Sequence, residues 1–196
     1  KATQLDAVVA HLHDIYEKEQ AVEVKKPWLP SLPDFMESPY TKKVVDSAQF
    51  KEGDYTLGIG LIDVPEEQLQ EEYQLNLMKN GHLLYMASGG YGKTMLLTNI
   101  AVGLSMKNSV RNLNFYILDL GNSGLIPLMG LPHVADYMGL DDGEKIEKFQ
   151  KMILDEIAER KRKFAKAMAQ SISVYNSSQA EPLKILVLLI DNFDSF

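Results

Sequence analysis

Residues 87–94 constrain the fold of this chain more than any other stretch. They read Ala-Ser-Gly-Gly-Tyr-Gly-Lys-Thr, follow the apolar run 82–86 and precede the helix-like run 95–101. A triphosphate needs several backbone N–H groups that point inward, and glycines allow this because they tolerate unusual φ/ψ angles. The following helix adds its positive N-terminal end. A strand, a Gly-rich loop and a helix in this order predict a phosphate-binding loop.

The residue types within the loop match the chemistry of a nucleotide site. Lys93 offers a mobile charge for the β- and γ-phosphates, and Thr94 offers the hydroxyl that holds Mg²⁺. The usual pattern is Gly-x-x-x-x-Gly-Lys-Ser/Thr, and its first glycine is Ala87 here, which a negative φ would tolerate. The alternative is a Gly-rich turn with an exposed lysine, and we favour nucleotide binding because of the flanks. The predicted nucleotide-binding residues are Ala87, Ser88, Gly89, Gly90, Tyr91, Gly92, Lys93 and Thr94.

Asp191 supplies the second half of the predicted site. It ends the apolar run 184–191, which is the Walker B pattern. A carboxylate there can bind the hydration shell of Mg²⁺ beside Thr94, so Thr94 and Asp191 are the predicted metal contacts. The alternative is an aspartate that only ends a strand and has no functional role. We favour the Walker B interpretation because the chain also has the upstream Gly-Lys-Thr. We assign the catalytic positions to Lys93 and Asp191.

The next position limits the expected chemistry. Many P-loop ATPases place Glu or Asp directly after the Walker B aspartate, and this chain has Asn192 there. A neutral amide can orient a water molecule but cannot accept its proton as a carboxylate does. We therefore expect nucleotide binding with slow or absent hydrolysis. The rival reading is an active ATPase whose carboxylate comes from Asp194 or from outside this segment.

A GTPase is disfavoured by the sequence. After the strand 114–119 the chain continues Leu120-Gly121-Asn122, where a D-x-x-G switch that starts at Asp119 would need glycine at position 122. No Asn-Lys-x-Asp element for guanine appears either.

Apolar runs alternate with helical patterns along the chain. Strands are expected at 82–87, 114–119 and 184–191, and helices at 94–106 and 144–169. This order predicts an α/β fold with a mainly parallel central sheet between helical layers. In such sheets ligands collect at the carboxyl ends of the strands, where Ala87, Asp119 and Asp191 all lie.

The upstream part reads differently from this core. It contains an amphipathic helix over 3–19, a Pro-rich strap over 26–33 that carries Trp28, and a Gly-broken strand over 55–62 that leads into a short acidic helix. We expect residues 1–50 to form an N-terminal helix and strap, and residues 51–196 to form the P-loop core. That core would need further C-terminal strands that are not in this sequence.

Composition excludes several classes. The 196 residues include no cysteine, so disulfide frameworks and thiolate chemistry are excluded. The net charge of −7 argues against a general nucleic-acid-binding surface, which normally carries a basic excess. The basic run 160–163 lies on an amphipathic helix and is interpreted as a solvated face. No run approaches the ~20 apolar residues that span a bilayer, and residues 1–20 show no signal-peptide pattern.

Several segments together resemble the FtsK/SpoIIIE-type ATPase domains of the EccC/EssC coupling proteins of type VII secretion. Order and spacing agree over nearly the whole chain. The matching segments are 26–33, 60–68, 81–83 with the loop that follows, 115–121, 131–136, 156–160 and 190–194.

The resemblance implies a RecA-like, three-layer P-loop fold that binds ATP and Mg²⁺. It implies a membrane-anchored protein with consecutive ATPase domains on the cytoplasmic face, which assembles as a hexamer and recruits helical-hairpin substrates of the WXG100 class. Membrane contact would come only through the full-length protein, and no nucleic acid is expected. Ala87 and Asn192 fit a degenerate later domain, the third of a Firmicutes-type protein or otherwise the second. His133 is expected to make a structural hydrogen bond, and a DNA translocase module is the remaining alternative.

Overall fold

The computed structural model describes residues 3–19, 28–36 and 53–195. The predicted boundary near residue 50 lies within 37–52, outside the described residues. The division into an N-terminal segment 1–50 and a core 51–196 therefore stays a prediction.

The chain forms two compact units. The first comprises residues 1–32 and 63–71, and the second comprises residues 33–62 and 72–196. The predicted nucleotide site lies entirely within the second unit.

The first unit contains helix α1 (Gln4–Glu19), as its apolar spacing predicts. Thr3 and Asp6 close its start, because the N–H of Thr3 donates to Asp6 Oδ2 at 2.7 Å and the N–H of Asp6 donates to Thr3 Oγ1 at 3.2 Å. Hydrogen bonds from the Thr3 backbone and side chain lower the pKa of Asp6. In the strap, Gln70 Nε2 donates to Pro30 O at 2.7 Å. The side chain of Trp28 in the strap is 80% exposed.

The second unit is built on a parallel sheet of three strands. Their order is β4 (Val134–Gly139), β3 (Leu113–Asp119) and β5 (Ile185–Asp191). The register of β3 on β5 runs from Leu113 opposite Ile185 to Asp119 opposite Asp191. Both strands therefore end at the same edge of the sheet, which confirms the predicted parallel architecture.

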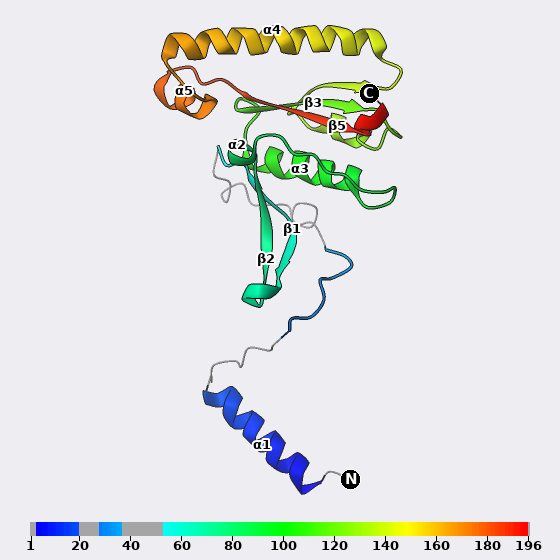
Figure 1. The fold of residues 1–196 in the computed structure, drawn as a ribbon, viewed down its shortest axis with the longest axis vertical. Helices are drawn as coiled ribbons and strands as arrows, with labels where there is room; N and C mark the ends of the chain where they lie inside the picture. Colours follow the sequence, from blue (N-terminus) through cyan, green and yellow to red (C-terminus); the bar gives the residue numbers. More distant parts are fainter. Residues whose placement is uncertain (1–2, 20–27, 37–52, 196) are drawn as a thin grey trace. The chain divides into compact units, whose positions relative to one another are not determined.

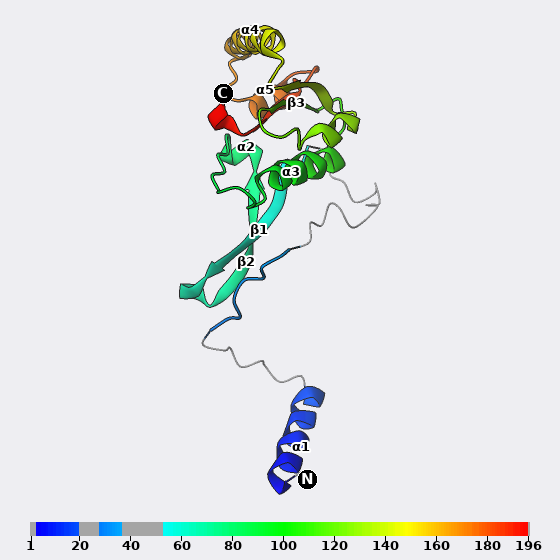
Figure 2. The same ribbon diagram turned by 90° about the vertical axis from the view of Figure 1, so that its right-hand side faces the viewer.

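Helices cover both faces of this sheet. Helix α3 (Lys93–Lys107) lies on one face and helix α4 (Gly143–Ala167) on the other (Figures 1 and 2). Alternate side chains of β3 point to opposite faces, as strand geometry requires. Phe115 and Ile117 pack in the cluster that contains Leu104 of α3, whereas Leu118 packs with Phe149 of α4. Burial of each such side chain contributes about 1.5–3 kcal/mol to folding, so these layers hold the site edge in place.

A hairpin and a short helix precede the phosphate-loop segment. Strands β1 (Thr56–Val64) and β2 (Leu69–Asn76) pair with each other. The predicted short acidic helix is η2 (Pro65–Glu67) between them, with Pro65 in its first turn. Helix α2 (Leu77–Asn80) begins where the Asn76 side chain accepts the N–H groups of Met78 and Lys79.

The base of the hairpin is fixed to α3. Leu57 and Leu75 are fully buried in the cluster that includes Leu104. Lys107 Nζ forms an ion pair with Asp54 Oδ2 at 2.9 Å. Burial opposes ionisation of Asp54, but hydrogen bonds from Lys107 and Thr56 outweigh it and lower the pKa of this carboxyl.

The segment 82–87 differs from its prediction as the first core strand. It carries no strand assignment, and its side chains Leu84 and Met86 are 72% and 79% exposed. A strand needs a hydrogen-bonded neighbour to be stable in water. Within the described sheet β5 pairs only with β3, so the segment has no strand beside it.

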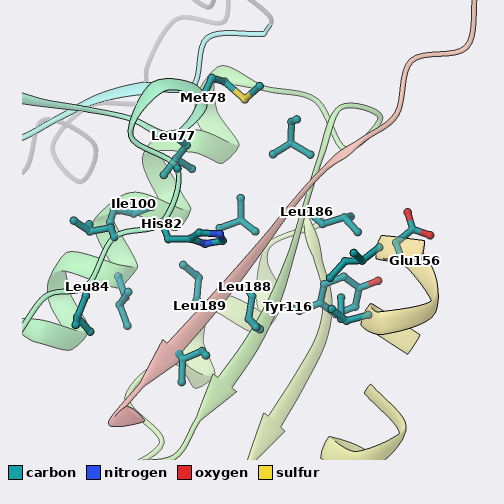
Figure 3. A pocket seen from close by; sticks show the side chains of 18 of the residues that line it. Leu77, Met78, His82, Leu84, Ile100, Tyr116, Glu156, Leu186, Leu188 and Leu189 are labelled. Carbon is teal, nitrogen blue, oxygen red and sulfur yellow. The ribbon is translucent and has the colours of Figure 1, made fainter. Parts of the chain in front are cut away.

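An apolar cavity of about 690 Å³ lies along β5 in the second unit. Leu186 and Leu188 of β5 line it together with His82 and Leu84 of the loop segment and Leu77 of α2 (Figure 3). Leu84 belongs to the segment that was predicted as the first core strand, and its side chain thus lines a cavity beside β5.

The sequence did not predict every element. Strands β2 and β4 and helix α5 (Ile172–Ser178) were missed, since their sequences show only weak periodicity. The remaining short helices are η3 (Ile126–Gly130) and η4 (Phe193–Ser195). Among the described helices none combines the length and apolarity that crossing a bilayer requires.

Candidate functional site

The loop 87–92 joins the irregular segment to the first turn of α3. Gly90 and Gly92 have φ angles of 83° and 77°, in the left-handed region that glycine enters without strain. Gly92 is also the residue that caps the N-terminus of α3, and no side chain caps that end. Backbone N–H groups at a helix start without a side-chain cap are available to an anion.

Lys93 folds back over this loop. Its Nζ donates to Ala87 O at 2.7 Å and to Ser88 O at 3.2 Å. The ammonium group is therefore held by the carbonyl groups at the start of the loop. A cation in this position can meet the terminal phosphates of a nucleotide.

Thr94 connects the two halves of the predicted site. Its hydroxyl donates to Asp191 Oδ2 at 2.6 Å, across 97 positions of sequence. Asp191 is 5% exposed at the end of β5, so its carboxylate is shielded from water. The contact brings together the two residues that we predicted as metal contacts.

Asn192 follows directly and turns away from the strand direction. Its φ is 61°, a left-handed value that asparagine adopts more readily than most residues. Its Nδ2 donates to Leu120 O at 3.3 Å, which ties the end of β5 to the end of β3. Asp194, the carboxylate of the rival reading, lies in η4 and is exposed.

Asp119 is a third polar residue at this edge. It is 2% exposed and stands opposite Asp191 in the sheet register. Its Oδ2 accepts the N–H of Leu125 at 2.8 Å and the hydroxyl of Tyr137 at 3.0 Å. Burial, followed by the hydrogen bond to Asp119 and its charge, raises the pKa of Tyr137, so the phenol stays protonated and donates.

The loop after β3 lies against Thr94. A Cβ placed on Gly124 would come within 2.8 Å of Thr94 Cγ2 and 3.2 Å of Asn122 Oδ1. Only glycine fits this approach without a shift of its neighbours. Sequence reasoning missed Gly124, and no local sequence pattern indicates it, because its approach to Thr94 depends on how the turn lies against α3.

His133 is positioned away from this edge. One of its ring nitrogens, Nε2, is 2.7 Å from Asn108 O, and the side chain is 7% exposed. The structural hydrogen bond expected of His133 is present.

The donor set fits Mg²⁺ bound together with a nucleotide. Mg²⁺ prefers oxygen ligands and usually binds one or two carboxylates plus substrate phosphates and water. Thr94 and Asp191 offer such oxygens, and Lys93 offers a positive charge beside them. No group of three His, Cys, Asp or Glu side chains within the described ranges could hold a metal ion alone. The ion would therefore depend on the phosphates for its remaining ligands.

The parallel sheet, the glycine loop at the start of α3 and the Thr94–Asp191 contact define a domain of the P-loop ATPase class. The profile of the FtsK/SpoIIIE family matches residues 42–191. The chain belongs to this family.

Two relatives give a more specific setting. The chain is 39% identical over 199 residues to the type VII secretion system protein EssC of Staphylococcus aureus strain Mu50, a match that covers 98% of the chain and 13% of EssC. It is 34% identical over 192 residues to the ESX secretion system protein EccC of Geobacillus thermodenitrificans, with 98% and 12% covered. The chain thus spans about an eighth of the length of these relatives.

Solved structures give the same result. A structure of EssC ATPases 2 and 3 from Geobacillus thermodenitrificans matches with a TM-score of 0.74 and 36% identity, over 85% of this chain and 30% of the solved chain. Thermomonospora curvata EccC, ATPases 2 and 3 in complex with a signal sequence peptide, matches with a TM-score of 0.64 and 25% identity, over 85% and 31%. The α/β P-loop fold predicted from the sequence is therefore confirmed.

Proposed function

We propose that this chain is an ATP-binding domain of a type VII secretion coupling ATPase. It binds ATP with Mg²⁺ through residues 87–94 and Asp191, and it hydrolyses ATP weakly or not at all by itself. The observation that carries this proposal is the 2.6 Å hydrogen bond from Thr94 to Asp191, because it joins the predicted phosphate loop to the predicted metal-binding strand.

Each residue has a separate task in this function. The loop amides and Lys93 bind the phosphates, while Thr94 and Asp191 place the metal ion. Bound Mg²⁺ would neutralise charge on the β- and γ-phosphates. Asn192 can orient water without accepting its proton, which supports slow turnover.

The biological role rests on the relatives. EssC and EccC are proteins of type VII and ESX secretion systems, and the similar structure of Thermomonospora curvata EccC holds a signal sequence peptide. These likenesses support a domain that recruits WXG100-type substrates and drives their export, within a longer membrane-anchored protein that acts as a hexamer at the cytoplasmic face of the membrane. We place the chain as the third ATPase domain, with the second as the alternative.

Titration calorimetry with ATP and Mg²⁺ tests the binding claim. Wild type should bind ATP. Lys93→Ala should weaken binding by about tenfold or more, which corresponds to ~1.4 kcal/mol, because it removes the positive charge that meets the phosphates. Lys148→Ala is the matched control, because Lys148 lies on α4, is largely exposed and pairs only loosely with Glu144 at 3.4 Å. The control should bind as wild type does.

Two results would overturn the proposal. One is the absence of heat with wild type at millimolar ATP, and the other is equal binding by wild type and Lys93→Ala. Robust phosphate release by the purified chain, abolished in Lys93→Ala, would retain ATP binding but reject slow hydrolysis.

A further inference from the structure

Asp119 is a buried carboxylate with one unused oxygen. Its Oδ2 accepts hydrogen bonds from Leu125 and Tyr137, whereas Oδ1 is buried and has no hydrogen-bonding partner among the described residues. A buried polar atom left unpaired costs free energy, and more so when the group is charged. Native proteins hold few such atoms, and each calls for an explanation. The hydrogen bonds from Leu125 and Tyr137 satisfy Oδ2 and leave Oδ1 without a donor.

The free oxygen lies beside Gly121, in the turn that follows β3. A Cβ built on Gly121 would lie 3.9 Å from Asp119 Oδ1 and 3.4 Å from Asn192 Cβ, so Asp119 and the residue after Asp191 border the same glycine. Asp119 also stands opposite Asp191 in the register of β3 and β5. Neighbouring strands are about 4.8 Å apart, which puts the two acidic residues side by side at the edge that receives the ligand.

The loop held by Asp119 touches the metal-binding threonine. The bond from Leu125 N–H to Oδ2 closes the turn 120–125, and Gly124 in that turn approaches Thr94 Cγ2. Asp119 thus belongs to the same cluster as Thr94 and Asp191, although it is not part of either linear motif.

We propose that Asp119 is a second acidic residue of the nucleotide site, whose Oδ1 accepts a hydrogen bond from a water molecule bound to Mg²⁺. This inference rests on the proposed function. Mg²⁺ keeps several waters when it is bound by carboxylates and phosphates, and those waters need acceptors. Many P-loop ATPases have a second carboxylate directly after the Walker B aspartate, but this chain has the neutral Asn192 there. In this proposal the second negative charge comes from Asp119 at the end of the neighbouring strand β3.

The structure also offers a plainer role, in which Asp119 only holds the turn 120–125. Asp119→Asn separates the two. The amide oxygen can keep both bonds of Oδ2, while the NH₂ group replaces Oδ1 and cannot accept a hydrogen bond. Tyr137→Phe is the matched control, because it removes one bond to Oδ2 and leaves Oδ1 intact.

The affinity of a fluorescent ATP analogue, measured in EDTA and across a Mg²⁺ titration, is the readout. Asp119→Asn should bind in EDTA as well as wild type or better, because one negative charge near the phosphates is gone. Its gain in affinity on adding Mg²⁺ should fall by about tenfold, the scale of one hydrogen bond to a charged group. Tyr137→Phe should keep the Mg²⁺ gain within about twofold.

Gly121→Ala decides the matter if Asp119→Asn fails to fold. Its methyl group would stand 3.9 Å from Oδ1 and would narrow the space beside that oxygen, without touching the bonds of Oδ2. It should reduce the Mg²⁺ gain as Asp119→Asn does.

This inference alone would be overturned if Mg²⁺ raised the affinity of Asp119→Asn for the analogue as much as that of wild type. It would also be overturned if Tyr137→Phe lost as much of this Mg²⁺-dependent increase as Asp119→Asn does. If Asp119→Asn does not fold, a Mg²⁺-dependent increase in affinity of Gly121→Ala equal to that of wild type would overturn the inference instead. A wild type that binds no nucleotide under either condition would overturn the proposed function together with it.

Discussion

At the residue scale, Thr94 carries the contact on which the site depends. Its hydroxyl is the hydrogen-bond donor to a carboxylate that is 5% exposed. Because Asp191 is shielded from water, loss of this donor is not made good by solvent. The contact therefore contributes to folding as well as to metal binding.

We expect Thr94→Val to lower the free energy of unfolding by about 1–3 kcal/mol, the cost of leaving a buried acceptor unpaired. Valine keeps the volume of threonine and removes the hydroxyl. Thr94→Ser keeps the hydroxyl and should lose less. Urea denaturation of the nucleotide-free chain followed by circular dichroism measures both, and a valine variant as stable as wild type would show that the bond contributes nothing.

The sequence predicted Thr94 and Asp191 because each belongs to a linear pattern. Thr94 ends the Gly-rich pattern 87–94, and Asp191 ends an apolar run. Asp119 also ended a predicted strand, but its part in the site depends on the strand register that places it opposite Asp191. Gly124 depends on how a turn lies against α3. Such contacts between segments have no local sequence signature.

At the element scale, the strands of this chain formed where a neighbour was present to pair with them. The runs 114–119 and 184–191 were predicted as buried strands, and they became β3 and β5, hydrogen-bonded to each other. The run 82–87 has similar apolar character but no strand beside it in the described sheet. Of the three apolar runs predicted as strands of the central sheet, two therefore formed strands and one did not.

Hydrogen exchange tests this difference. Amides of residues 83–86 should exchange within the dead time of a manual experiment, since their segment carries no strand pairing. Amides of residues 115–118, in the central strand β3, should be among the slowest in the chain. Mass spectrometry of peptides from the two segments of one sample provides an internal control. Comparable protection of both segments would show that 82–87 is a paired strand in solution.

At the scale of the whole molecule, charge separates the two candidate partner classes. The net charge is −7, and the basic run on α4 is partly neutralised within its own helix. Arg160 pairs with Glu156 at 2.6 Å, and Lys163 pairs with Glu159 at 2.7 Å. Arg160 also donates to Lys184 O at the start of β5. These guanidinium and ammonium groups already have partners on the protein, which makes a phosphate-binding stripe on this helix unfavourable.

We expect this chain to retain a WXG100-type hairpin and not duplex DNA. Non-specific DNA binding draws its free energy from the release of counterions by clustered Lys and Arg, which an acidic surface does not supply. Immobilised hairpin and immobilised duplex, each exposed to the purified chain at 50 and 150 mM salt, provide the measurement. A hairpin without its signal sequence is the matched control and should retain less protein. Retention on DNA that falls steeply with salt, without retention on the hairpin, would reverse the assignment of the partner. The proposed nucleotide site would not be affected by that result, because its residues lie at the end of the sheet and not on the exposed side of α4.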